Sequence, residues 1–82
     1  MTDRKSAIPP IEPVYRAVGV RIEMIRAAIG MTQDDLAKRV GYTRTSLCNI
    51  ESGRQRLPLH QVEQIAAALG TNPKHLLKGI WL

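Results

Sequence analysis

Apolar residues recur along this chain at the spacing of an α-helix, and a glycine closes each stretch of the pattern. The first stretch has residues four, four, three and four positions apart, namely Val14, Val18, Ile22, Ile25 and Ile29. Residues at these spacings lie on one stripe of a helix, which Gly30 can end. No segment of useful length alternates with a period of two, so we expect no sheet. The pattern therefore predicts an all-α protein.

Two short helices are predicted on either side of Gly41. Thr32 has a hydroxyl group that can cap a helix start, and Asp35 follows at the spacing of a capping box. Gly41 can adopt a positive φ at little steric cost, so the chain can turn sharply there. Thr43 can then cap a further helix from about residue 44 to residue 51. The inner faces of these two helices would be formed by Leu36, Ala37, Val40, Leu47 and Ile50.

Proline and glycine positions indicate two more helices. Pro58 suits the first turn of a fourth helix, which Gly70 closes. Asn72 and Pro73 start a short fifth helix. The residues expected to face inward are Val62, Ile65, Ala66, Leu69, Leu76 and Leu77. The 82 residues are enough for one compact core, so these five helices would form one bundle.

The two ends of the chain differ from its middle. Residues 1–13 carry three of the five prolines and show no helical period, which predicts an extended N-terminal arm. The helical domain is then expected from residue 14 to residue 79. Residues 80–82 form a short apolar tail.

Positive charge is concentrated in the middle of the chain. The 12 Lys and Arg residues exceed the 7 Asp and Glu residues by five. Within residues 38–60 Glu51 is the only acid, and the bases are Lys38, Arg39, Arg44, Arg54 and Arg56. Such a local excess favours a polyanionic partner, either a phosphate backbone or anionic lipid. No apolar run approaches the roughly 18 residues of a membrane span, so we expect no membrane-spanning protein.

Other functional classes have little support in the sequence. Cys48 is the only cysteine, which excludes an internal disulfide and favours a reducing, cytoplasmic location. A small packed side chain is a commoner role for it than a redox sensor. His60 and His75 lack metal-ligand spacing, and no nucleophile, base and orienting group stand together. We therefore expect a protein that is not an enzyme and that takes no cofactor, metal or small-molecule ligand.

The segment after Gly41 has the face pattern of a helix that reads DNA. Leu47 and Ile50 are three apart and would face the core. Helical periodicity then turns Thr45 and Asn49 nearly opposite to them. The flanking positions are Arg44, Ser46 and Cys48. A helix that is apolar only on its inner side can enter a DNA major groove, which is about 12 Å wide.

From about residue 22 to residue 77 the chain resembles the phage-repressor and Cro-like helix-turn-helix proteins, often called the XRE family. The resemblance rests on the spacings between Arg26, Gly30, Thr32, Gln33, Leu36, Ala37, Val40, Gly41, Leu47, Ile50, Glu51, Gly53, Ala68, Leu69, Gly70, Leu76 and Leu77. It implies a five-helix, lambda-repressor-like bundle with a central helix-turn-helix. There is one departure: Pro58 lies five residues after Gly53, where the family commonly has four.

The resemblance also implies roles for individual residues. Gln33 would bond a phosphate, and the base edges would face Arg44, Thr45 and Asn49. Arg44 suits guanine and Asn49 suits adenine, because each side chain can form two hydrogen bonds to that base. Helix starts and basic side chains add further phosphate contacts from Tyr42, Thr43, Ser46, Arg54 and Arg56. The alternatives are a solvated helix surface, helix capping and, for Tyr42, a cover over the core edge.

Two further sets of residues have expected structural roles. The resemblance implies an ion pair between Arg26 in the first helix and Glu51 at the end of the third. The apolar C-terminus would rarely stay fully exposed in a soluble monomer. It either folds back through Trp81 over the fifth helix or forms a homodimer interface of Leu77, Ile80, Trp81 and Leu82. Dimers of this class bind half-sites about 34 to 36 Å apart, so the operator would be roughly palindromic.

These observations predict a sequence-specific transcriptional regulator, a repressor rather than an activator, that binds double-stranded DNA as a homodimer. One alternative is a protein-interaction adaptor or antitoxin-type module with the same fold, whose third helix would carry more apolar or acidic residues outward. Another is binding to anionic membrane, which needs a basic helix with a free apolar face. The sequence does not separate a phage repressor from a restriction-modification controller or an antitoxin.

Overall fold

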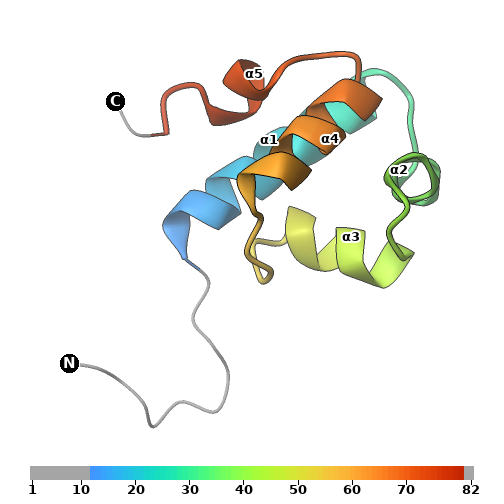
Figure 1. Cartoon of the computed structure of the whole chain (residues 1–82), viewed down its shortest axis with the longest axis horizontal. Helices are drawn as coiled ribbons and strands as arrows, with labels where there is room; N and C mark the ends of the chain where they lie inside the picture. The colour runs from blue at the N-terminus through green and yellow to red at the C-terminus, as the bar shows by residue number, and fades with distance from the viewer. Residues whose placement is uncertain (1–11, 81–82) are drawn as a thin grey trace, which may run out of the picture.

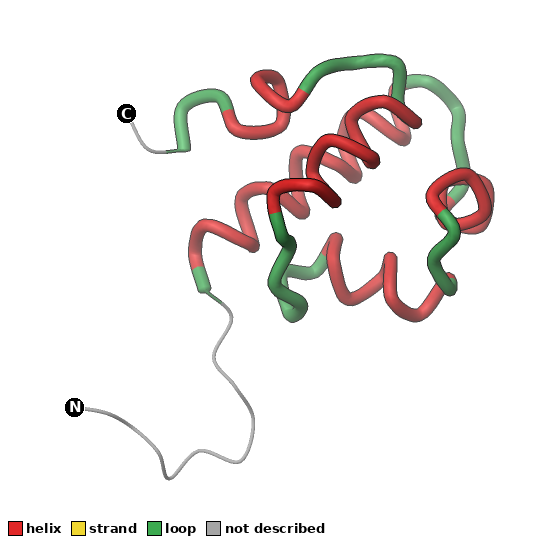
Figure 2. Tube along the Cα trace, in the orientation of Figure 1, coloured by secondary structure: helices red, strands yellow, loops and turns green. Residues whose placement is uncertain are grey.

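The computed structural model describes residues 12–80, so the predicted arm up to residue 11 and the tail residues Trp81 and Leu82 lie outside the described residues. Five helices follow one another, and this part of the chain contains no strand (Figure 1, Figure 2). The helices are α1 (Pro13–Ala28), α2 (Gln33–Val40), α3 (Arg44–Glu51), α4 (Leu59–Ala68) and α5 (Pro73–Leu77). The predicted all-α, five-helix architecture is confirmed.

The ends of α1 differ slightly from the prediction. The helix begins at Pro13, one residue earlier than expected, because a backbone N–H at this position would have no partner within the helix and its loss is harmless. Glu12 precedes it with an extended backbone and makes no side-chain capping hydrogen bond. At the other end Ile29, predicted to face the core, is 51% exposed. The helix stops at Ala28, so Ile29 no longer follows the helical stripe.

Side-chain caps fix the starts of three of the four later helices, α2, α3 and α5. Thr32 Oγ1 accepts the Asp35 backbone N–H at 3.0 Å, and the Asp35 carboxylate accepts the Thr32 N–H at 3.2 Å, which is the predicted capping box. Thr43 Oγ1 accepts the Ser46 N–H at 3.0 Å. Asn72 caps α5 in the same way. The local sequence therefore determines where these helices begin.

The capping box makes stability depend on pH. The hydrogen bond from the Thr32 backbone N–H lowers the pKa of Asp35 below its ordinary value. A carboxylate with a lowered pKa stabilises the fold above its unfolded pKa of about 3.9, and this contribution is lost as pH falls through the folded value. We expect Asp35→Asn to lower the urea midpoint at about pH 6, and this difference from the wild type to disappear as pH falls below the lowered pKa of Asp35. A deficit that stays constant over this range would contradict a role for the charged carboxylate.

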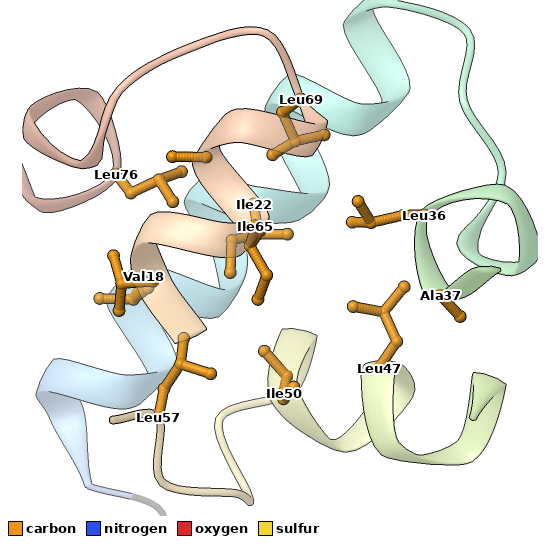
Figure 3. Packing of buried hydrophobic residues seen from close by; sticks show 12 residues of the cluster. Val18, Ile22, Leu36, Ala37, Leu47, Ile50, Leu57, Ile65, Leu69 and Leu76 are labelled. Carbon is orange, nitrogen blue, oxygen red and sulfur yellow. The ribbon is translucent and has the colours of Figure 1, made fainter. Parts of the chain in front are cut away.

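One hydrophobic core connects the five helices (Figure 3). α1 packs on α3 and α5, α2 packs on α3 and α4, and α4 packs on α5. The buried apolar residues are Val18, Ile22, Leu36, Ala37, Leu47, Ile50, Leu57, Val62, Ile65, Ala66, Leu69 and Leu76. Leu57 lies in the loop before α4, where there is no helical period to predict its burial. Val40 and Leu77, predicted to face inward, are half-buried at the edge of the core.

Backbone contact between α1 and the end of α3 fixes the position of α3. A Cβ atom added at Gly19 would lie 2.5 Å from the carbonyl oxygen of Ile50 and closer still to that of Glu51. A Cβ atom at Gly53, which has a φ of 82°, would lie 2.7 Å from the Cα atom of Arg16. Both values are below any normal contact, so only glycine fits here. The end of α3 is therefore held against α1 by direct backbone contact, in addition to the packing of its buried side chains.

Candidate nucleic-acid interface

α3 turns an apolar side to the core and a polar side to solvent. It lies along the lower edge of the bundle in Figure 1, with α5 along the upper edge. Leu47 and Ile50 point into the core and are 0% and 2% exposed (Figure 3). Thr45 is exposed, and Asn49 is half-buried and lines a surface hollow. The remaining outward positions are Arg44, Ser46 and Cys48.

Glu51 connects the three helices that build this face. Its side chain is 4% exposed, and its carboxylate accepts hydrogen bonds from Arg26 Nε at 2.7 Å and Arg26 Nη2 at 3.1 Å. It also accepts a hydrogen bond from Gln33 Nε2 at 2.9 Å. The pair that the family resemblance implied between Arg26 and Glu51 is thus present in the structure. The hydrogen bond to Glu51 raises the pKa of Arg26, so the guanidinium stays charged.

Gln33, expected to contact a phosphate, has its side chain held by a hydrogen bond to the buried Glu51. It is the first residue of α2, and one of its two amide N–H groups goes to Glu51. An amide group has a second N–H that can donate to another acceptor, and the helix dipole favours an anion at a helix N-terminus. Sequence reasoning missed the contact with Glu51, because it joins residues 18 positions apart without a motif.

The other candidate phosphate ligands near the turn already hold internal hydrogen bonds. The Tyr42 hydroxyl donates to Gln64 Oε1 at 3.1 Å, its ring packs against the core, and burial raises its pKa. Thr43 Oγ1 caps α3, and Gln55 Nε2 donates to Ser46 Oγ at 3.3 Å. A hydroxyl group both donates and accepts hydrogen bonds, so the capping oxygen of Thr43 keeps a donor for a ligand.

The loop between α3 and α4 forms a second part of this surface. Arg54 and Arg56 are exposed, and they line a hollow of about 810 Å³ together with Asn49, Gln55 and Glu12. Arg56 Nε donates to the Glu12 carboxylate at 2.8 Å, and this hydrogen bond raises the pKa of Arg56. Sequence reasoning missed Glu12 and Gln55. The ion pair joins residues 44 positions apart, and only the fold brings them together.

The predicted dimer residues are only partly described. Leu77 and Ile80 are half-buried against the core, whereas Trp81 and Leu82 lie outside the described residues. Leu77 lines an apolar hollow of about 260 Å³. The hollow is completed by Val14, Tyr15, Val18, Leu57, Pro58, Leu59 and Val62. Leu59 is 71% exposed, and its apolar side chain at the start of α4 was no part of the predicted interface.

The fold and the site define a class of protein. Two short helices joined by a tight glycine turn, the second with its polar side outward, form a helix-turn-helix within a five-helix bundle. A family model described as a helix-turn-helix domain matches residues 17–78, and the chain belongs to this family. The resemblance to phage-repressor and Cro-like proteins seen in the sequence is confirmed.

Curated relatives of the chain bear the names of regulators. A hypothetical transcription factor of Neisseria meningitidis serogroup B is 33% identical over 81 residues, which cover 94% of this chain and 76% of that protein. The control protein C.BamHI of Bacillus amyloliquefaciens is 37% identical over 60 residues, which cover 72% of this chain and 74% of that protein. A helix-turn-helix-type transcriptional regulator of Methanothermobacter thermautotrophicus is 44% identical over 45 residues, which cover 55% of this chain and 65% of that protein. The chain thus spans between 65% and 76% of the length of these relatives.

Solved structures share this fold either over nearly their whole chain or over one part of a longer chain. The restriction-modification controller protein C.AhdI of Aeromonas hydrophila has a TM-score of 0.73 and 29% identity, covering 76% of this chain and 94% of that chain. Hydroxypropylphosphonic acid epoxidase from S. wedmorenis has a TM-score of 0.74 and 26% identity, but the match covers only 35% of that chain. The enzyme is thus similar over one part only.

A search of residues 12–80 finds no helix with the length and hydropathy that a membrane span requires.

Proposed function

We propose that this chain is a sequence-specific transcriptional repressor that binds a palindromic operator in double-stranded DNA as a homodimer. The observation that carries the proposal is α3, whose apolar side is buried while Arg44, Thr45 and Asn49 lie at the surface. The names of the relatives, a transcription factor and a control protein, support the same class. A cytoplasmic location and the absence of enzymatic activity, cofactor and small-molecule ligand are parts of this proposal.

In this proposal, the outward side of α3 reads base edges in the major groove. Arg44 donates two hydrogen bonds to guanine O6 and N7, and Asn49 pairs with adenine N6 and N7. Thr45 contacts a thymine methyl group or bonds a neighbouring base. Because Leu47 and Ile50 anchor the opposite side of the helix, the three reading side chains share one fixed frame.

Phosphate contacts before and after α3 hold this helix in a fixed position along the DNA. Near the starts of α2 and α3 they come from Gln33, Tyr42, Thr43 and Ser46. Beyond the end of α3 they come from Arg54 and Arg56, which are exposed on the loop. Such contacts carry no sequence information, but they supply most of the salt-dependent affinity.

The apolar hollow beside α5 supports the homodimer. Its walls include Leu77 of α5 and the 71% exposed side chain of Leu59. A second copy could bury this hollow about a two-fold axis, with the same surface used by both copies. Helix-turn-helix dimers bind half-sites about 34 to 36 Å apart along the DNA, and we expect the same spacing here.

Selection from random duplex DNA at about 150 mM salt tests the proposal, because specific binding persists at this salt while non-specific binding weakens. An enriched inverted repeat would support both sequence-specific binding and a dimer. A single enriched half-site would support sequence-specific DNA binding but contradict the proposed homodimer. No enriched sequence at all would contradict sequence-specific regulation.

Replacing Arg44 by alanine is expected to relax the selected sequence at one position of each half-site. The loss should correspond to about 1 to 3 kcal/mol of discrimination at that base pair. Lys38→Ala is the matched control, because Lys38 is an exposed base of α2 that pairs with Asp34 at 3.4 Å. It should weaken binding to all sequences about equally. An unchanged consensus for Arg44→Ala would remove Arg44 from the reading residues.

A second candidate function is a protein-interaction adaptor or antitoxin-type module. The observation that favours it is the same apolar hollow, because a protein partner would bury it as well as a second copy would. Sedimentation of the purified chain as a monomer, together with a selection that enriches no sequence, would favour this candidate over the regulator.

A further inference from the structure

One carboxylate lines a hollow that two arginines also line. Glu12 lines the same hollow as Asn49, Arg54 and Arg56. Its carboxylate accepts the Arg56 Nε hydrogen bond at 2.8 Å, and the side chains of Arg56 and Glu12 are 78% and 43% exposed. The residue comes from the start of α1, outside the basic segment of the sequence. Folding therefore places an acid against one of the arginines that would meet DNA.

Helix capping does not explain this acid. Glu12 is the N-cap residue of α1, but its side chain makes no capping hydrogen bond. An acid near a helix N-terminus is favoured by the helix dipole, yet the carboxylate is bonded to Arg56 instead. The pairing with Arg56 is thus the observed use of this side chain.

A carboxylate in this place competes with a phosphate. Both are anions that accept hydrogen bonds from a guanidinium. If both approach Arg56, the distance between the carboxylate and the phosphate is less than the Debye length of about 8 Å at physiological salt, so their repulsion is only partly screened. A phosphate that bonds Arg56 must therefore displace Glu12 or approach it against charge repulsion. In either case the contact yields less affinity than an arginine without an acidic partner.

We propose that Glu12 is an internal competitor for a DNA phosphate at Arg56 and thereby sets the affinity and salt dependence of DNA binding. The inference rests on the proposed function, since it presumes that this face meets DNA. It adds a residue outside the helix-turn-helix to those that determine binding. Glu12 acts through Arg56 and takes no part in base reading.

The test compares Glu12→Gln with the wild-type chain on a random-sequence duplex. Freeing Arg56 should raise affinity about threefold to tenfold at about 50 mM salt, because one more phosphate is neutralised per subunit. The log-log slope of affinity against salt should steepen by about 0.9 per subunit. The gain should therefore shrink by about 3.5-fold per subunit between 50 mM and 200 mM salt.

Two controls separate this from a change in net charge. Glu63→Gln removes an exposed acid of α4 that does not line the hollow, and it should change affinity much less. In the Arg56→Gln background, Glu12→Gln should bring no further gain. Circular dichroism during heating would verify that each variant is folded.

Three results would overturn the proposal. Glu12→Gln could weaken binding, which would make Glu12 a support for Arg56 rather than its competitor. It could match Glu63→Gln, which would reduce the effect to net charge. Its gain could also persist without Arg56. If the wild type itself shows no salt-dependent binding to duplex DNA, the proposed function fails, and this inference fails with it.

Discussion

Replacing Gly19 by alanine is expected to destabilise the fold by about 3 kcal/mol, at the upper end of the usual cost of overpacking. The added Cβ atom would lie 2.5 Å from the carbonyl oxygen of Ile50 and closer still to that of Glu51. Both are backbone atoms at the end of α3, so no side-chain rotation relieves the overlap. Small domains are stable by only about 5 to 15 kcal/mol, so urea unfolding followed by circular dichroism would register the loss clearly.

Gly70→Ala provides the control for this prediction. Gly70 has a φ of 74°, and a Cβ atom there would meet nothing within 4 Å. Alanine at this position should cost only the left-handed conformation, about 1 to 2 kcal/mol. If Gly19→Ala is no less stable than Gly70→Ala, then α1 and α3 can move apart freely, and the backbone contact does not fix the position of α3.

The caps and glycine turns explain why so much of the fold follows from the sequence. The start of α2 depends on Thr32 and Asp35, three residues apart, and the start of α3 depends on Thr43 and Ser46. Both are contacts between near neighbours, so local chemistry is enough to predict them. Ile29 shows the limit of periodicity, because a repeat of apolar residues does not state where the helix stops.

Contacts between distant segments were beyond the reach of such reasoning. Nothing local marks Gly19 as the point where α1 touches α3, because its role depends on backbone that lies more than 30 residues further along. Leu57 is buried from a loop, where no periodicity exists. The sequence marks Gly53 only as one position of the family spacing, yet in the structure it lies against Arg16. Tertiary packing, rather than local propensity, determines each of these positions.

In the candidate interface, too, local features could be predicted from the sequence and contacts between distant segments could not. Leu47 and Ile50 alone indicate which side of α3 faces outward, because helical geometry links the two sides of one helix. The hydrogen bonds that hold the surrounding side chains link separate elements, as Gln33 does with Glu51 and Arg56 with Glu12. Sequence spacing predicts which residues share a face, but it does not predict which partner each one has.

Replacing Arg26 by methionine is expected to cost about 3 to 5 kcal/mol, the usual effect of removing one partner of a buried ion pair. Methionine keeps most of the aliphatic volume, so the loss should come from charge and hydrogen bonding. Glu51 is 4% exposed, and of its hydrogen bonds with residues 12–80 it would keep the one from Gln33. The Arg26 hydrogen bond to the Met31 carbonyl oxygen at 2.8 Å would disappear as well.

The double variant with Glu51→Gln identifies the cause of that loss. An amide at residue 51 leaves no buried charge and can still accept the hydrogen bond from Gln33. The double variant should therefore be more stable than Arg26→Met alone by about 1 to 3 kcal/mol. Glu23→Gln, which removes an exposed acid near Arg26, should change stability by less than about 0.5 kcal/mol. A double variant no more stable than Arg26→Met would show that the unpaired carboxylate is not what destabilises the fold.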